Sequence, residues 1–274
     1  MKNILITGNA GYIGGHLVNL LRKKKKYQLY GLDYNGCPAS LHRHFNYNIV
    51  SLPRIDTEFD TVIHLAALVN VGESVRDPLS YYQTNLVGTA NILESCRYNN
   101  FIFASTGAAS GMGSPYGISK KAAEEVVEQI CKEDNKPYTI FRFYNVIGSD
   151  GVSPTNPDGL MLNLIKAGET GEFNLFGTDY NTPDGTAIRD YVHVNEICHA
   201  LIEAIERPAN GIENLGHGRG HSVLEMVNLY KKVNKVKFKT VPCPRRAGDL
   251  EVCVLDNPSK YLPNLYSIED LLRI

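Results

Sequence analysis

The fold of this chain is decided by the segment Gly8-Asn9-Ala10-Gly11-Tyr12-Ile13-Gly14. An apolar run at residues 3–7 precedes it and predicts a strand, and an amphipathic run at residues 11–23 predicts a helix after it. Its GxxGxxG spacing lets the backbone turn tightly and approach a diphosphate. The first helical turn adds N–H donors and the positive end of the helix dipole. A strand, a glycine loop and a helix in this order predict a dinucleotide site.

The cofactor is predicted from Asp33, which ends a second apolar run at residues 27–33 and lies 19 residues after Gly14. A carboxylate at this place accepts hydrogen bonds from the hydroxyls of the adenosine ribose and repels a 2′-phosphate. The sequence therefore favours NAD over NADP. The alternative at this point is that Asp33 is only a turn residue.

A second motif, Tyr116-Gly117-Ile118-Ser119-Lys120, follows further along the chain. Residues four apart on a helix share a face, so the phenol and the ammonium are expected to be neighbours. A phenol with a pKa near 10 is a poor base at neutral pH, and a nearby cation is expected to lower the pKa of Tyr116. Such a pair takes a proton from an alcohol. Together the two motifs predict a nicotinamide-dependent enzyme that acts on a carbinol.

The first 147 residues alternate apolar runs with amphipathic ones, which predicts a doubly wound parallel α/β sheet of the Rossmann type. Strands are expected at residues 3–7, 27–33, 45–50, 61–66, 100–105 and 138–144, and helices at 11–23, 78–98 and 114–135. Ligands of such sheets bind at the carboxyl ends of the strands. Residues 1–147 are therefore predicted to form a NAD-binding domain.

Residues 148–159 are rich in Gly, Pro, Ser, Asp and Asn, which predicts a loop or crossover between domains. Beyond it, helices are expected at residues 160–167, 195–207 and 222–233, and a strand at 173–176. Residues 148–274 are predicted to form a smaller α+β substrate-binding lobe, with segments that could return to the first domain.

Composition excludes several classes of function. The 274 residues carry a net charge of −1, which gives no general attraction to nucleic acid or to a membrane. Six scattered cysteines without a CxxC pair predict no metal site and a reducing cytoplasm. No apolar run approaches the length of a signal peptide core or a membrane span. The basic run at residues 23–26 is interpreted as the solvated end of the first helix.

The two motifs resemble those of the extended short-chain dehydrogenase/reductase family, and within it those of UDP-glucose (UDP-galactose) 4-epimerases. Further segments that carry the resemblance lie at residues 62–67, 71–75, 85–89, 176–180, 184–186, 189–194, 214–216 and 244–250. The likeness extends over nearly the whole chain.

The resemblance implies a role for each matching residue. It assigns NAD binding to Gly8, Gly11, Tyr12, Ile13, Gly14, Asp33, Leu65, Ala66, Ala67, Thr84, Ser105, Tyr116, Lys120 and Tyr144. It assigns catalysis to Thr106, Tyr116 and Lys120, and contacts with the nucleotide sugar to Thr106, Tyr116, Asn145, Arg189, Arg246, Asp249 and Cys253.

The implied activity is NAD-dependent epimerisation of a UDP-hexose at C4 through a transient 4-keto sugar. Gly107 follows Thr106 where related dehydratases carry an acid, which argues against elimination of water. Cys253 stands where a bulky residue narrows the pocket, so N-acetylated UDP-sugars are expected to fit. The family also implies a homodimer formed through the helices at residues 78–98 and 114–135. Two alternatives remain: another nucleotide-sugar epimerase or oxidoreductase, and a non-catalytic NAD-binding regulator.

Overall fold

The computed structural model describes residues 1–274 except 37–40, 112, 150–151, 247 and 274. Contacts between residues divide the chain into two compact units. One contains Met1–Arg142 and Cys198–Glu213, and the other Phe143–Ile197 and Asn214–Ile274. The chain thus leaves the first unit, returns to it for a short stretch, and ends in the second. Within the described ranges, no helix has the length and apolar character needed to cross a membrane.

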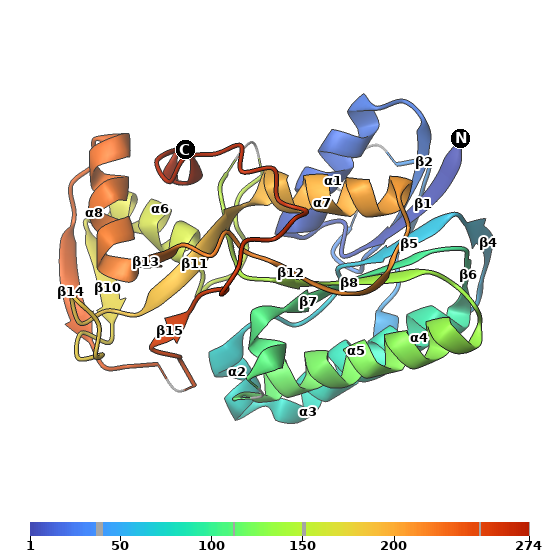
Figure 1. Cartoon of the computed structure of the whole chain (residues 1–274), viewed down its shortest axis with the longest axis horizontal. Helices are drawn as coiled ribbons and strands as arrows, with labels where there is room; N and C mark the ends of the chain where they lie inside the picture. Colours follow the sequence, from blue (N-terminus) through green and yellow to red (C-terminus); the bar gives the residue numbers. More distant parts are fainter. Residues whose placement is uncertain (37–40, 112, 150–151, 247, 274) are drawn as a thin grey trace. The chain divides into compact units, whose positions relative to one another are not determined.

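The first unit is built on a seven-stranded sheet with the order β12-β8-β7-β5-β1-β2-β3 (Figure 1). Its strands are β12 (Asn210–Leu215), β8 (Tyr138–Phe143), β7 (Phe101–Thr106), β5 (Thr61–His64), β1 (Lys2–Thr7), β2 (Tyr27–Leu32) and β3 (Arg43–Phe45). The pairs β1–β2, β1–β5, β5–β7 and β2–β3 are parallel. The predicted doubly wound α/β sheet is confirmed.

Helices cover both faces of this sheet. Figure 1 shows α1 (Tyr12–Lys23) and α7 (Val194–Glu206) on one face, and α4 (Gly88–Ser95) and α5 (Pro115–Glu133) on the other. The core under α4 and α5 joins buried side chains from the sheet, such as Val62 and Phe103, to Ile92 and Val127 on the helices. Burial of such apolar side chains contributes roughly 1.5–3 kcal/mol each, so this face fixes the catalytic helix α5 on the sheet.

One helix departs from its prediction. Residues 78–98 were expected to form a single helix, but the structure has α3 (Pro78–Tyr81), a π-helical turn at Tyr82–Val87 and then α4. A short helix α2 (Val71–Arg76) precedes them. The predicted end is also wrong, because Cys96–Tyr98 forms β6, which pairs with β4 (Ile55–Phe59) in a separate two-stranded parallel sheet. That pairing is not local, so it overrides the helical spacing of the segment.

The third strand is also shifted. It was expected at residues 45–50, but β3 ends at Phe45 and a 3₁₀ turn follows at Ile49–Ser51. Asn48 caps this turn, because its Oδ1 accepts a hydrogen bond from the Val50 amide at 2.9 Å. A side chain that satisfies the backbone locally in this way competes with a sheet ladder, which explains the early end of the strand.

The second unit contains two small sheets. In one, β11 (Ile188–His193) pairs with β13 (Gly220–Ser222), β15 (Val252–Cys253) and β9 (Asn145–Ile147). In the other, β10 (Glu172–Phe176) pairs with β14 (Lys239–Cys243). The predicted helices here are confirmed as α6 (Leu160–Thr170), α7 and α8 (Val223–Asn234). α8 begins with a capping box between Ser222 and Glu225, which satisfies two backbone donors reciprocally.

Candidate active site

The glycine loop between β1 and α1 folds back on its own backbone. Gly8 has φ = +71°, and a Cβ atom there would lie 2.8 Å from the Ala66 amide nitrogen. A Cβ atom on Gly14 would lie 2.1 Å from the carbonyl oxygen of Gly8. Neither position has room for a side chain, and the predicted residues Tyr12 and Ile13 form the first turn of α1. The loop thus presents bare backbone at a helix N-terminus, which suits a diphosphate.

Asp33 follows β2 and braces this loop. Its Oδ2 accepts a hydrogen bond from the Ala10 amide at 3.1 Å, and its Oδ1 accepts one from the Asn35 amide at 2.9 Å. An ionised carboxylate has about four acceptor sites, so two backbone donors leave capacity for ribose hydroxyls. The negative charge disfavours a 2′-phosphate. The residues therefore fit NAD.

The other predicted cofactor residues lie on neighbouring elements. Leu65, Ala66 and Ala67 follow β5, and the Ala66 amide donates to Thr7 Oγ1 at 3.1 Å. Ser105 is the penultimate residue of β7, and Thr84 lies half-buried in the π-helical turn. Tyr144 follows β8 in the second unit, where its amide donates to the Leu215 carbonyl at 3.2 Å. Its role toward NAD stays a prediction.

Thr106 and Tyr116 are brought together by a short connection. Thr106 is the last residue of β7, and a 3₁₀ turn at Gly107–Ser110 follows it directly. Tyr116 lies in the first turn of α5, which Ser114 caps by accepting from the Gly117 amide at 3.2 Å. The Thr106 hydroxyl acts on the phenol, because it lowers the pKa of Tyr116 in part. Thr106 Oγ1 also accepts from the Ala108 amide at 3.2 Å, which fixes its orientation.

Lys120 lies one turn further along α5, and its Nζ lies 4.0 Å from the centre of the Phe103 ring. Burial lowers the pKa of Lys120 to about 7, and Glu124 opposes part of that change. The pKa of Tyr116 is raised by burial and lowered in part by its hydrogen bond to Thr106. The expectation that the ammonium lowers the pKa of Tyr116 is therefore wrong for this arrangement. The cation contacts an aromatic face, and desolvation of the phenolate dominates.

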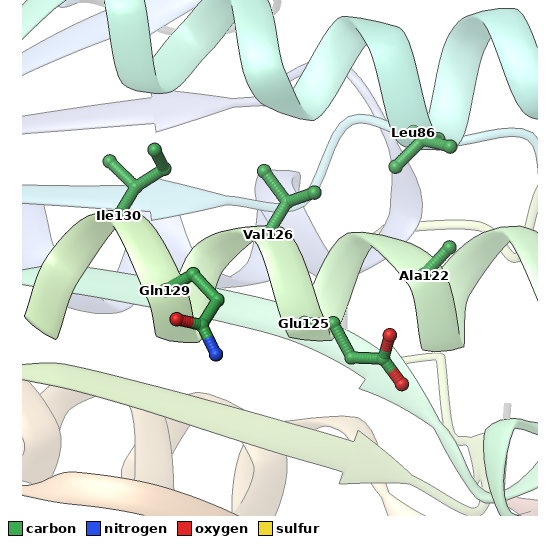
Figure 2. A pocket seen from close by; sticks show the side chains of 6 residues that line it. All are labelled: Leu86, Ala122, Glu125, Val126, Gln129 and Ile130. Atoms are coloured by element: carbon green, nitrogen blue, oxygen red, sulfur yellow. The ribbon is translucent and has the colours of Figure 1, made fainter.

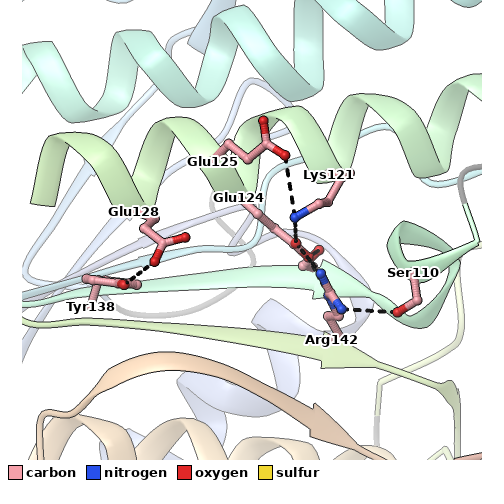
Figure 3. A network of polar contacts seen from close by, with 8 residues as sticks. Ser110, Lys121, Glu124, Glu125, Glu128, Tyr138 and Arg142 are labelled. Carbon is pink, nitrogen blue, oxygen red and sulfur yellow. Dashed lines mark hydrogen bonds and ion pairs between the residues drawn. The ribbon is translucent and has the colours of Figure 1, made fainter. Parts of the chain in front are cut away.

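The sequence analysis missed Glu124, a buried carboxylate behind the site (Figure 3). Its Oε1 accepts from Ser105 Oγ at 2.5 Å and from Arg142 Nε at 2.8 Å, and its Oε2 accepts from Arg142 Nη2 at 2.6 Å. Arg142 also donates to Ser110 Oγ at 3.1 Å. The network ties β7, β8, α5 and the 3₁₀ turn together. The signal for it was available, because Glu124 is four residues after Lys120 and shares its helix face.

In the second unit, the small sheet collects four of the predicted substrate residues. Arg189 Nη2 donates to Asp249 Oδ1 at 2.6 Å. Cys253 pairs with Arg189 in the register of β11 and β15, and burial raises the pKa of its thiol. Asn145 starts β9, and its Nδ2 donates to the Asp190 carbonyl at 3.4 Å. Arg189 thus contacts Asp249 and lies opposite Cys253, whereas Asn145 contacts the neighbouring Asp190.

Two consecutive arginines nearby differ in their partners. The Arg245 guanidinium lies 4.1 Å from the Tyr180 ring centre and pairs with Asp179 at 2.8 Å. The Arg246 guanidinium lies 4.2 Å from the Phe176 ring centre and donates to the Asp158 carbonyl at 3.0 Å. Among the residues that the structure describes, Arg246 has no carboxylate partner. Its role toward the substrate stays a prediction.

Comparison with known proteins supports the same interpretation. Residues 4–216 match the family model described as "NAD dependent epimerase/dehydratase family". A UDP-glucose 4-epimerase of Haemophilus influenzae is 33% identical, with 92% of this chain and 89% of that protein covered.

Two solved structures resemble the chain over nearly its whole length. The UDP-glucose 4-epimerase of Bifidobacterium longum in complex with NAD+ and UDP has a TM-score of 0.85 and 27% identity, with 99% of this chain and 96% of that chain covered. The UDP-Glc/GlcNAc 4-epimerase of Campylobacter jejuni has a TM-score of 0.78 and 29% identity, with coverages of 99% and 97%. The match of the family model over most of the sequence is decisive: this chain belongs to the NAD-dependent epimerase/dehydratase family.

Proposed function

We propose that this protein uses NAD to interconvert a UDP-hexose and its C4 epimer. The observation that carries the proposal is the placement of Thr106 at the end of β7, Tyr116 in the first turn of α5 and Lys120 one helical turn further along. The glycine loop and Asp33 of the same unit fit the cofactor. The similar proteins that are named as UDP-glucose 4-epimerases support the choice of substrate.

The roles of the residues follow from their chemistry. NAD, when bound, supplies a reversible two-electron oxidant at the sugar carbon. Tyr116 accepts the proton of the O4 hydroxyl as C4 is oxidised, and returns it when C4 is reduced on the other face of the ring. Thr106, the last residue of β7, is assigned to orient the hydroxyl. Lys120, one turn further along α5, is assigned to the cofactor. There is no net redox change.

The second unit is proposed to hold the nucleotide part of the substrate. Arg189 and Arg246 supply guanidinium groups, which donate bidentately to phosphate oxygens. Asp249 contacts Arg189, and Asn145 lies opposite Tyr191 in the register of β9 and β11, so they offer carboxylate and amide groups for the nucleoside. A solved relative with bound UDP supports this assignment.

A second proposal concerns N-acetylated sugars. Cys253 carries a small side chain opposite Arg189 in the register of β11 and β15, which leaves more room than an aromatic residue would. The similarity to a UDP-Glc/GlcNAc 4-epimerase supports acceptance of UDP-N-acetylglucosamine. The expected result is turnover of both UDP-glucose and the acetylated sugar. No turnover of the acetylated sugar would contradict this proposal.

A homodimer is also proposed, formed through the helices of the first unit. Exposed apolar side chains lie on α3, the π-helical turn and α5: Leu79, Val87, Ile118 and Ile130. A groove lies beside them, lined by Leu86, Ala122, Glu125, Val126, Gln129 and Ile130 (Figure 2). Burying this strip against a second copy would remove apolar area from water. Analytical ultracentrifugation should show a dimer that Ile130→Glu converts to a monomer.

The cytoplasmic location stays a proposal as well. It is supported by five free cysteines, Cys96, Cys131, Cys198, Cys243 and Cys253. Cys37 lies outside the described residues. Immunodetection of the protein in cell fractions tests it.

The experiment for the main proposal follows the anomeric proton signals of UDP-galactose by NMR, with the pure protein and NAD. Appearance of UDP-glucose is the expected result. NAD binding without any turnover of UDP-hexoses would favour the non-catalytic regulator. Turnover of a different nucleotide sugar, or net accumulation of NADH, would favour the other alternative.

A further inference from the structure

A buried histidine outside the catalytic set lies at the centre of a hydrogen-bonded chain. His64 ends β5 and is fully enclosed. Its Nδ1 lies 2.7 Å from Thr7 Oγ1, and its Nε2 lies 3.0 Å from Thr89 Oγ1. Its ring stacks on Phe103, with centres 5.7 Å apart, and Phe103 in turn carries the Lys120 ammonium.

The partners of the two threonines fix the direction of each hydrogen bond. Thr89 Oγ1 donates its single hydrogen to the Asn85 carbonyl at 2.6 Å. Thr89 therefore accepts from His64, so Nε2 carries a hydrogen. Thr7 Oγ1 accepts from the Ala66 amide at 3.1 Å and has its own hydrogen free to donate to Nδ1. A hydroxyl has one donor and two acceptor sites, so both threonines are satisfied only by this neutral tautomer.

The chain continues from Asn85 to the catalytic helix. Asn85 Nδ2 donates to Ser119 Oγ at 3.1 Å, and Ser119 Oγ donates to the Tyr116 carbonyl at 2.8 Å. The same amide side chain exchanges two hydrogen bonds with the backbone of Leu68, at 2.8 and 3.0 Å. At its other end, Thr7 directly precedes Gly8. These hydrogen bonds thus join the start of the glycine loop and the loop after β5 to Tyr116.

We propose that His64 is a positioning residue, locked as the neutral Nε2–H tautomer, which holds the cofactor loops in register with Tyr116. This role rests on the proposed epimerase function and adds a residue to it. Protonation of His64 would turn Nδ1 into a donor, so that the Thr7 hydroxyl would lose the acceptor of its hydrogen, and would place a second cation near Lys120. Burial and the nearby Lys120 charge lower the pKa of His64 to about 3, which agrees with a permanently neutral ring.

The tautomer is tested without any enzymatic assay. Long-range ¹H–¹⁵N NMR of protein labelled at histidine should show one ring with the neutral Nε2–H pattern, unchanged from pH 8 to pH 5. An ordinary histidine titrates near pH 6.5. The His64 signals would be assigned by their loss in His64→Gln. An Nδ1–H pattern, or a midpoint near pH 6.5, would overturn the proposal.

The positioning role is tested with matched threonine variants. Thr89→Val removes the acceptor of the Nε2–H group, whereas Thr139→Val removes a buried hydroxyl on β8 that lies outside the chain. Thr89→Val should lower kcat by about tenfold or more relative to Thr139→Val. KM for the UDP-hexose should stay unchanged, because no residue of this hydrogen-bonded chain is assigned to the nucleotide part of the substrate.

Equal kcat for the two threonine variants would contradict the positioning role. If Thr89→Val does not fold, Ser119→Ala replaces it, since alanine favours the helix, with the same loss of kcat expected. If the wild-type protein turns over no UDP-hexose, the proposed function fails, while the NMR pattern still decides the tautomer.

Discussion

The two units of this protein prepare their polar groups in opposite ways. In the first unit, Tyr116 and Lys120 are buried. Desolvation raises the pKa of Tyr116 and lowers the pKa of Lys120, so it favours the neutral form of both side chains. In the second unit, Arg189 donates to the Asp249 carboxylate and Arg246 donates to the Asp158 carbonyl. The difference separates chemistry from binding: proton transfer profits from a dry site with shifted pKa values, whereas an anionic nucleotide requires fixed positive charge.

The largest expected effect comes from the buried phenol. Tyr116→Phe removes the group that moves the proton, so kcat should fall by about 10²–10⁴-fold. The protein should remain folded, because the ring keeps its packing. Tyr98→Phe is the matched control, since Tyr98 is a buried tyrosine of the same unit whose hydroxyl contacts Cys131. Similar activity losses in both variants would show that Tyr116 is not the proton carrier.

The buried cation should reduce stability at neutral pH. The folded protein lowers the pKa of Lys120 from 10.5 to about 7, so between these values the unfolded chain binds more protons. Stability therefore rises with pH across this window and carries the full penalty below pH 7. Lys120→Met should raise the free energy of unfolding by ~1–3 kcal/mol at pH 6, with the gain vanishing toward pH 10.

Urea denaturation of the two proteins across pH measures this difference. A Lys120→Met variant that is less stable than the wild type at pH 6 would show that burial of the ammonium carries no penalty. In either case the variant should lose activity.

The two consecutive arginines sharpen the comparison from the side of the second unit. Arg246→Leu should raise KM for the UDP-hexose roughly tenfold with little change in kcat, because it removes a charge-assisted contact in ground and transition states alike. Arg245→Leu is the matched control, because Arg245 is already paired with Asp179. Steady-state kinetics of both variants shows which of the two arginines contacts the substrate. A larger change in KM for Arg245→Leu than for Arg246→Leu would show that Arg245, not Arg246, contacts the substrate.

The smallest effect is expected at Cys253. Cys253→Tyr adds a bulky side chain beside Arg189, so turnover of the N-acetylated sugar should fall by about tenfold while turnover of UDP-glucose changes a few-fold at most. A clash of this kind costs about 1–3 kcal/mol. The ratio of kcat/KM for the two sugars measures it. An unchanged ratio would indicate that Cys253 does not border the sugar.

The sequence predicted the parts of the site that depend on local spacing. The glycine loop precedes α1, Asp33 follows β2, and Tyr116 and Lys120 lie four residues apart on α5. Local spacing did not predict that residues 78–98 break into α3, a π-helical turn, α4 and β6. The last of these elements, β6, is fixed by pairing with β4 about 40 residues earlier in the sequence.

The missed parts of the site depend on contacts between distant segments. His64 connects Thr7 on β1 with Thr89 on α4, and no spacing along the chain shows that these hydroxyls meet one ring. The pKa of Tyr116 was misjudged for a related reason. Helical spacing places Lys120 near the phenol, but only the fold shows that both groups are dry and that the ammonium lies over Phe103.

The central claim is that C4 is oxidised and reduced within one site without loss of its hydrogen. It is tested most directly with UDP-galactose that carries deuterium at C4, incubated with the protein and NAD in ordinary water. The account predicts UDP-glucose that retains the deuterium at C4, with no NADH released. Loss of the deuterium to solvent, or its appearance in free NADH, would contradict it.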